Sequence, residues 1–111
     1  MYLNDWKEGG KEQLISAFEI EENALDGCNI LLASYEYECY EGDAFVLYEK
    51  EGKLFEVNGS HCSCYELEGQ WEPEETTKEA LLKRINDGSL GSYYGDSNIY
   101  KAELLEVLSR I

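Results

Sequence analysis

A period of two in the apolar positions marks residues 29–40 as a β-strand. One set of alternate positions in this stretch contains Ser34, Glu36 and Glu38. The other set contains Leu31, Ala33, Tyr35, Tyr37 and Cys39. Because successive side chains of a strand point to opposite faces, this alternation predicts one buried face and one solvated face.

Two shorter apolar runs follow, Ala44–Tyr48 and Lys53–Val57, separated by the polar link Glu49–Gly52. Links this short join antiparallel neighbours, since parallel neighbours need a crossover of about a dozen residues. The pattern therefore predicts a three-stranded antiparallel meander, with strands near residues 29–38, 44–50 and 53–58.

Apolar residues at helical spacing predict three helices, near residues 11–18, 77–87 and 97–110. Thr76 and Glu79 have the spacing of a capping box, which places the start of the second helix at Thr76. Asp96 or Ser97 is expected to cap the third helix. We therefore expect an α+β fold in one domain, residues 1–111, with the three helices packed on one face of the meander.

Composition changes this picture mainly through charge. Nine Lys and Arg residues against 24 Asp and Glu residues give a formal net charge of −15 at pH 7. A field of that sign repels nucleic acids and anionic membranes and attracts basic proteins. We therefore expect a basic protein partner and no direct binding to nucleic acid or membrane. The alternative is that the negative charge serves only to keep the protein soluble.

The beginning of the chain, MYLNDWKEGG, has neither the basic nor the apolar region of a signal peptide. No run approaches the ~20 apolar residues that a membrane-spanning helix needs. A cytoplasmic location is expected, in which the four cysteines of the chain stay reduced.

The single histidine and the cysteines are the candidate metal ligands. They are Cys28, Cys39, His61, Cys62 and Cys64. Structural zinc sites take four thiolate or imidazole ligands, usually as two closely spaced pairs. Here ten residues separate the first two cysteines, and one residue separates the last two. Because this spacing differs from the usual one, we expect no cofactor, and a bound zinc ion is the alternative. Without a metal, the cysteines are expected to behave as small buried apolar residues.

No set of residues indicates catalysis. His61 and Cys62 are adjacent, and adjacent residues of a strand face opposite ways, so they are poorly placed for a thiol–imidazole pair. No carboxylate stands in an apolar context that would single it out as an acid or base. We expect no enzymatic activity and assign no catalytic residue.

Eight acidic residues are the candidate partner-binding residues. Two alternate with tyrosines in the first strand, two lie in the turn expected after it, and four lie in the polar stretch after residue 64. They are Glu36, Glu38, Glu41, Asp43, Glu66, Glu68, Glu72 and Glu74. Tyrosine is enriched at protein interfaces, and complementary charge selects basic partners. The expected partner is a basic protein whose nucleic-acid groove receives carboxylates in place of phosphates.

The segment Val57–Leu81 reads VNGSHCSCYELEGQWEPEETTKEAL and resembles small uncharacterised acidic phage and prophage accessory proteins. This resemblance implies a phage-encoded protein in the cytoplasm of a bacterial host. It further implies an inhibitor of a basic host protein, such as a defence nuclease, acting as a DNA mimic; a protein that neutralises a basic toxin belongs to the same class. A small zinc-binding accessory module with a Cys/His site is the alternative function.

Overall fold

The computed structural model describes residues 2–4, 6–38, 41–61, 67, 69–87, 92–93, 97–98 and 100–111. Its elements, in chain order, are β1 (Tyr2–Asn4), α1 (Gly10–Phe18), a 3₁₀ helix (Glu22–Leu25), β2 (Asn29–Glu38), β3 (Glu41–Lys50), β4 (Lys53–His61), β5 (Glu74–Thr76), α2 (Lys78–Asn86), β6 (Ser92–Tyr93), β7 (Ser97–Asn98) and α3 (Lys101–Ser109). The α+β class is confirmed.

The main sheet has the strand order β1-β2-β3-β4-β5. The central strands β2, β3 and β4 form the predicted antiparallel meander. Two edge strands of three residues each were missed: β1, which is parallel to β2, and β5, which is antiparallel to β4. Strands this short carry no usable periodicity, so only their hydrogen-bonded neighbours identify them.

A two-residue turn joins β3 to β4. Lys50 pairs with Lys53, and the intervening Glu51 and Gly52 both have positive φ, 54° and 79°. Positive φ at both central positions defines the type I′ turn, whose twist matches that of the strands it joins. This geometry gives the predicted hairpin its register.

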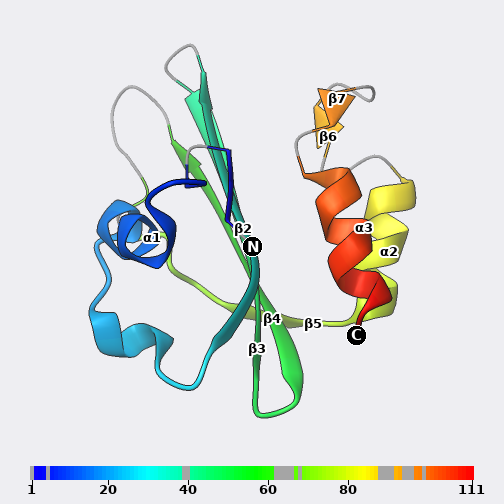
Figure 1. Ribbon diagram of the computed structural model, residues 1–111, viewed down its shortest axis with the longest axis horizontal. Helices are drawn as coiled ribbons and strands as arrows, with labels where there is room; N and C mark the ends of the chain where they lie inside the picture. Colours follow the sequence, from blue (N-terminus) through cyan, green and yellow to red (C-terminus); the bar gives the residue numbers. More distant parts are fainter. Residues whose placement is uncertain are drawn as a thin grey trace.

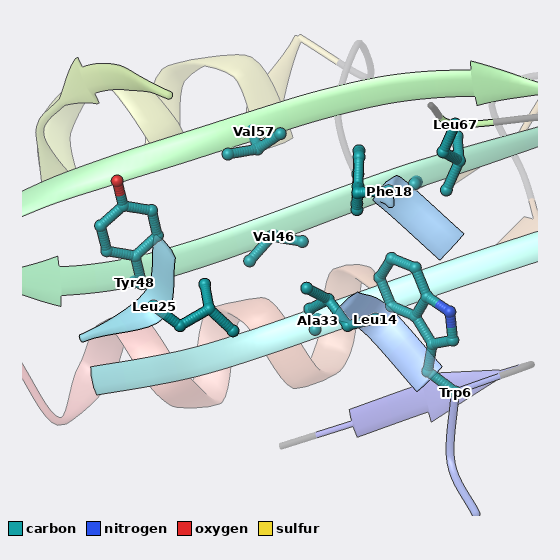
Figure 2. Close-up of a cluster of buried hydrophobic side chains, with 10 residues drawn as sticks. Trp6, Leu14, Phe18, Leu25, Ala33, Val46, Tyr48, Val57 and Leu67 are labelled. Carbon is teal, nitrogen blue, oxygen red and sulfur yellow. The ribbon is translucent and has the colours of Figure 1, made fainter. Parts of the chain in front are cut away.

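The helices cover both faces of the sheet, so the expected packing on one face is wrong (Figure 1). Residues 44–48 of β3 are all buried, with alternate side chains in two separate cores. On the α1 face, Val46 packs with Leu14 and Phe18 of α1 (Figure 2). On the α2–α3 face, Phe45 and Leu47 pack with both C-terminal helices. A strand that is apolar on both faces needs a cover on each side, and residues at both ends of the chain provide one.

The solvated face predicted for the first strand is also partly wrong. Leu32 and Ser34 are buried on the α2–α3 face. The pairing register shifts between Ile30 and Leu32, so the alternation does not run unbroken through the strand. The Ser34 hydroxyl accepts a hydrogen bond from Asn4 Nδ2 at 2.7 Å, which explains how a polar side chain is accommodated there.

Two predicted helix starts need correction. Thr76 ends β5, paired with Leu54, and Thr77 is the N-cap of α2, its hydroxyl accepting a hydrogen bond from the Ala80 amide at 3.1 Å. The third helix begins at Lys101 rather than near residue 97, because Ser97 belongs to β7. In both cases a strand pairing takes the residues that could have begun the helix.

Candidate partner-binding surface

Four of the eight candidate acids lie in facing positions near the chain link between β2 and β3. The strand register places Glu36 opposite Asp43, and Glu38 opposite Glu41. These positions continue the α2–α3 face, beyond buried Ser34 and Phe45. Directly opposed positions of an antiparallel pair are about 5 Å apart on the same face. We call these four residues the acidic hairpin end.

The four acids lie in a stretch of sequence that contains no Lys or Arg. The chain has no Lys or Arg between residues 12 and 49, nor between residues 54 and 77. The nearest basic residues along the meander, Lys50 and Lys53, flank the turn at its opposite end. Like charges in directly opposed positions destabilise a strand pair. The strand register therefore brings four acidic positions to this end of the hairpin, in a stretch of sequence without basic residues.

Of the other four candidate acids, Glu74 does not join this group. Glu72 and Glu74 are exposed, but Glu74 lies on β5 at the opposite edge and pairs with Glu56. Ser60 of β4 lies opposite Asp43, and Glu56 is four residues away from Ser60 on the same strand. At the usual rise of a strand, this distance along β4 is about 13 Å. Glu66 and Glu68 lie outside the described residues.

The predicted metal ligands are not brought together as a set. Cys28 directly precedes Asn29 of β2. Asn29 pairs with Glu49 of β3, and Glu49 pairs with Leu54 near the start of β4. His61 is the last residue of β4, seven residues after Leu54. Seven residues of β4 span about 23 Å, far more than the ~2.0–2.3 Å from zinc to each of its ligands. One zinc ion cannot bind both Cys28 and His61, so the part of the prediction that combines these two residues is wrong.

Cys39, Cys62 and Cys64 lie outside the described residues. Within the part of the chain that the structure describes, no cluster of His, Cys, Asp or Glu side chains is arranged to hold a metal ion. The Cys28 thiol is free and half-buried, and its Sγ lies 3.9 Å from the carbonyl oxygen of Asp26.

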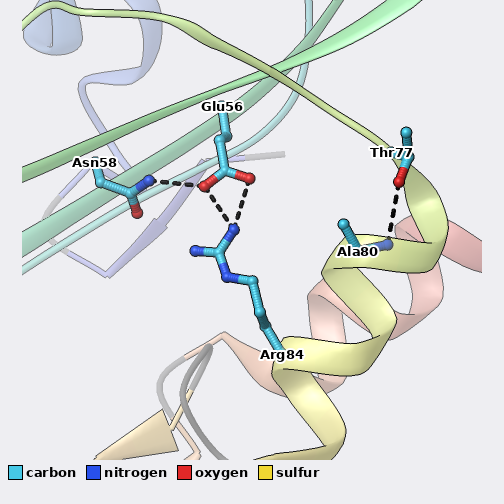
Figure 3. Close-up of polar contacts among 5 residues, drawn as sticks. All are labelled: Glu56, Asn58, Thr77, Ala80 and Arg84. Carbon is cyan, nitrogen blue, oxygen red and sulfur yellow. Dashed lines mark hydrogen bonds and ion pairs between the residues drawn. The ribbon is translucent and has the colours of Figure 1, made fainter.

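The sequence pattern missed a buried ion pair between the sheet and α2 (Figure 3). Glu56 of β4 is only 5% exposed, and both of its carboxylate oxygens lie 2.7 Å from Nη1 of Arg84. Asn58 Nδ2 donates a further hydrogen bond to Glu56 at 2.8 Å. The expectation that no carboxylate stands in an apolar context is therefore wrong for Glu56, whose position between Phe55 and Val57 was the signal in the sequence.

Burial by itself would raise the pKa of Glu56. Hydrogen bonds from Arg84, Asn58 and Thr76 and the positive charge of Arg84 outweigh burial and hold the pKa below its ordinary value. Glu56 is thus ionised at neutral pH, and internal donors occupy its carboxylate. Its role is to fix α2 against β4, and it is not available to a basic partner.

Net charge divides sharply along the chain. Residues 78–111, which include α2 and α3, contain five basic and five acidic residues. Residues 1–77 contain four basic and 19 acidic residues and therefore carry the whole net charge of −15. The negative field comes from the sheet and the segments before α2.

None of the helices that the structure describes is long and apolar enough to cross a membrane. No protein-family model, curated protein or solved structure matches the chain.

Proposed function

We propose that this chain is a small acidic protein of phage type that binds and inhibits a basic nucleic-acid-binding enzyme of a bacterial host. The observation that supports the proposal is the acidic hairpin end, with its facing pairs Glu36–Asp43 and Glu38–Glu41. Cytoplasmic action in the host cell is part of the same proposal.

The position of these acids supports a binding role more than a solubilising role. Charge that only keeps a protein soluble acts wherever it lies on the surface. Directly opposed like charges weaken the strand pair that carries them. A basic partner would remove this repulsion on binding, so the arrangement favours a complex over the free protein.

The spacing of the acids suits replacement of phosphates. Positions two apart on a strand are separated by about 6.7 Å, so two facing rows give one charge for about every 3.3 Å of strand. One strand of B-DNA carries one phosphate for about every 3.4 Å of helix axis. A groove built to neutralise phosphates would therefore meet a comparable charge density.

The test compares two variants of equal net charge, −13. Glu36→Gln with Glu38→Gln neutralises one row of the acidic hairpin end. The control is Glu79→Gln with Asp87→Asn, at exposed positions near the two ends of α2, where their effects on the helix dipole oppose each other. Displacement of labelled DNA from purified restriction and CRISPR nucleases is measured by fluorescence anisotropy.

We expect the natural protein to displace DNA from a nuclease in this set. The hairpin variant should bind that nuclease at least tenfold more weakly than the control, because removing one side of a desolvated charge pair costs about 2–5 kcal/mol. Equal affinities of the two variants would show that the overall field, and not this surface, drives binding. Failure of the natural protein to displace DNA from any of the nucleases would refute the proposed inhibition.

A further inference from the structure

We draw no further inference here: the strongest candidate, the facing acidic positions Glu36–Asp43 and Glu38–Glu41 at the end of the β2–β3 hairpin, belongs to the surface already described, and no second observation on the described part of the chain identifies a ligand for it.

Discussion

Glu56 lies on the α2–α3 face of β4, where the neighbouring Leu54 packs into the apolar core. An ionised carboxylate that is 5% exposed needs compensation, which Arg84 provides with 36% of its own side chain exposed. Such a pair is weak as a source of net stability, but removal of one partner leaves a buried charge without compensation. The pair therefore makes the packing of α2 on the sheet sensitive to a single residue.

Arg84→Met keeps the apolar stem and removes the guanidinium. We expect the free energy of unfolding to fall by about 3 kcal/mol at pH 7, the lower end of the range for a broken buried pair, because water reaches part of Arg84. The control is Arg110→Met, which removes the exposed pair between Arg110 and Glu106 and should change stability by less than about 0.5 kcal/mol. Urea denaturation measures both, and similar losses in the two variants would contradict the buried role of Glu56.

The pH dependence of stability follows from the lowered pKa of Glu56. A carboxyl group with a lower pKa in the folded state stabilises that state fully above its unfolded pKa, and this contribution disappears as pH falls through the folded pKa. Comparing the natural protein with Glu56→Gln isolates this group from the other acids. We expect the stability difference between them to be largest near pH 7 and to shrink below pH 4.5, the ordinary value for this carboxyl. A difference that stays constant down to pH 3 would mean that Glu56 is not held ionised.

Among the elements, the β3–β4 hairpin combines a favourable and a strained residue in one turn. Gly52, with φ of 79°, adopts the left-handed conformation without steric conflict, whereas Glu51 adopts it with a Cβ atom. A Cβ built at Gly52 would meet no atom within 4 Å, so replacing this glycine changes backbone strain without adding a clash.

Opposite effects are expected from two substitutions in this turn. Gly52→Ala should destabilise the protein by about 1 kcal/mol, because alanine disfavours positive φ. Glu51→Asn should stabilise it by several tenths of a kcal/mol, because Asn-Gly is a preferred pair for a type I′ turn. Thermal and urea unfolding measure both changes. Stabilisation by Gly52→Ala would show that the turn has another conformation.

At the scale of the whole molecule, charge opposes compactness. The net charge of −15 arises from residues 1–77, and mutual repulsion of like charges destabilises a compact state. Two variants with a net charge of −13 separate the general effect from the local one. Glu36→Lys places a cation opposite Asp43, whereas Glu75→Lys places one opposite Phe55.

Glu36→Lys should raise the free energy of unfolding by about 0.5–1 kcal/mol more than Glu75→Lys at low ionic strength, because it converts a repulsive facing pair into an attractive one. This advantage should decrease at about 0.5 M salt, where screening weakens interactions between exposed charges. Urea denaturation at both salt concentrations checks the result. Equal stabilisation by the two variants would mean that the facing positions Glu36 and Asp43 do not repel each other appreciably.

Local rules in the sequence were sufficient for the central elements of the fold. The alternation in residues 29–38, the short link at Glu51 and Gly52, and the apolar spacing in α1, α2 and α3 each depend on neighbours within a few residues. The net charge follows from composition alone. The shared face of Glu36 and Glu38 follows from local spacing, since positions two apart on a strand lie on the same side.

Contacts between distant segments decided the rest. The strand β1, the pairing of Thr76 with Leu54, and the covering of both sheet faces depend on residues far apart along the chain. The partner of Glu56 lies 28 residues away on α2, and no local pattern in the sequence names it. The opposition of Glu36 and Asp43 arises from the register between strands, because a shift of one residue would place the two acids on opposite faces.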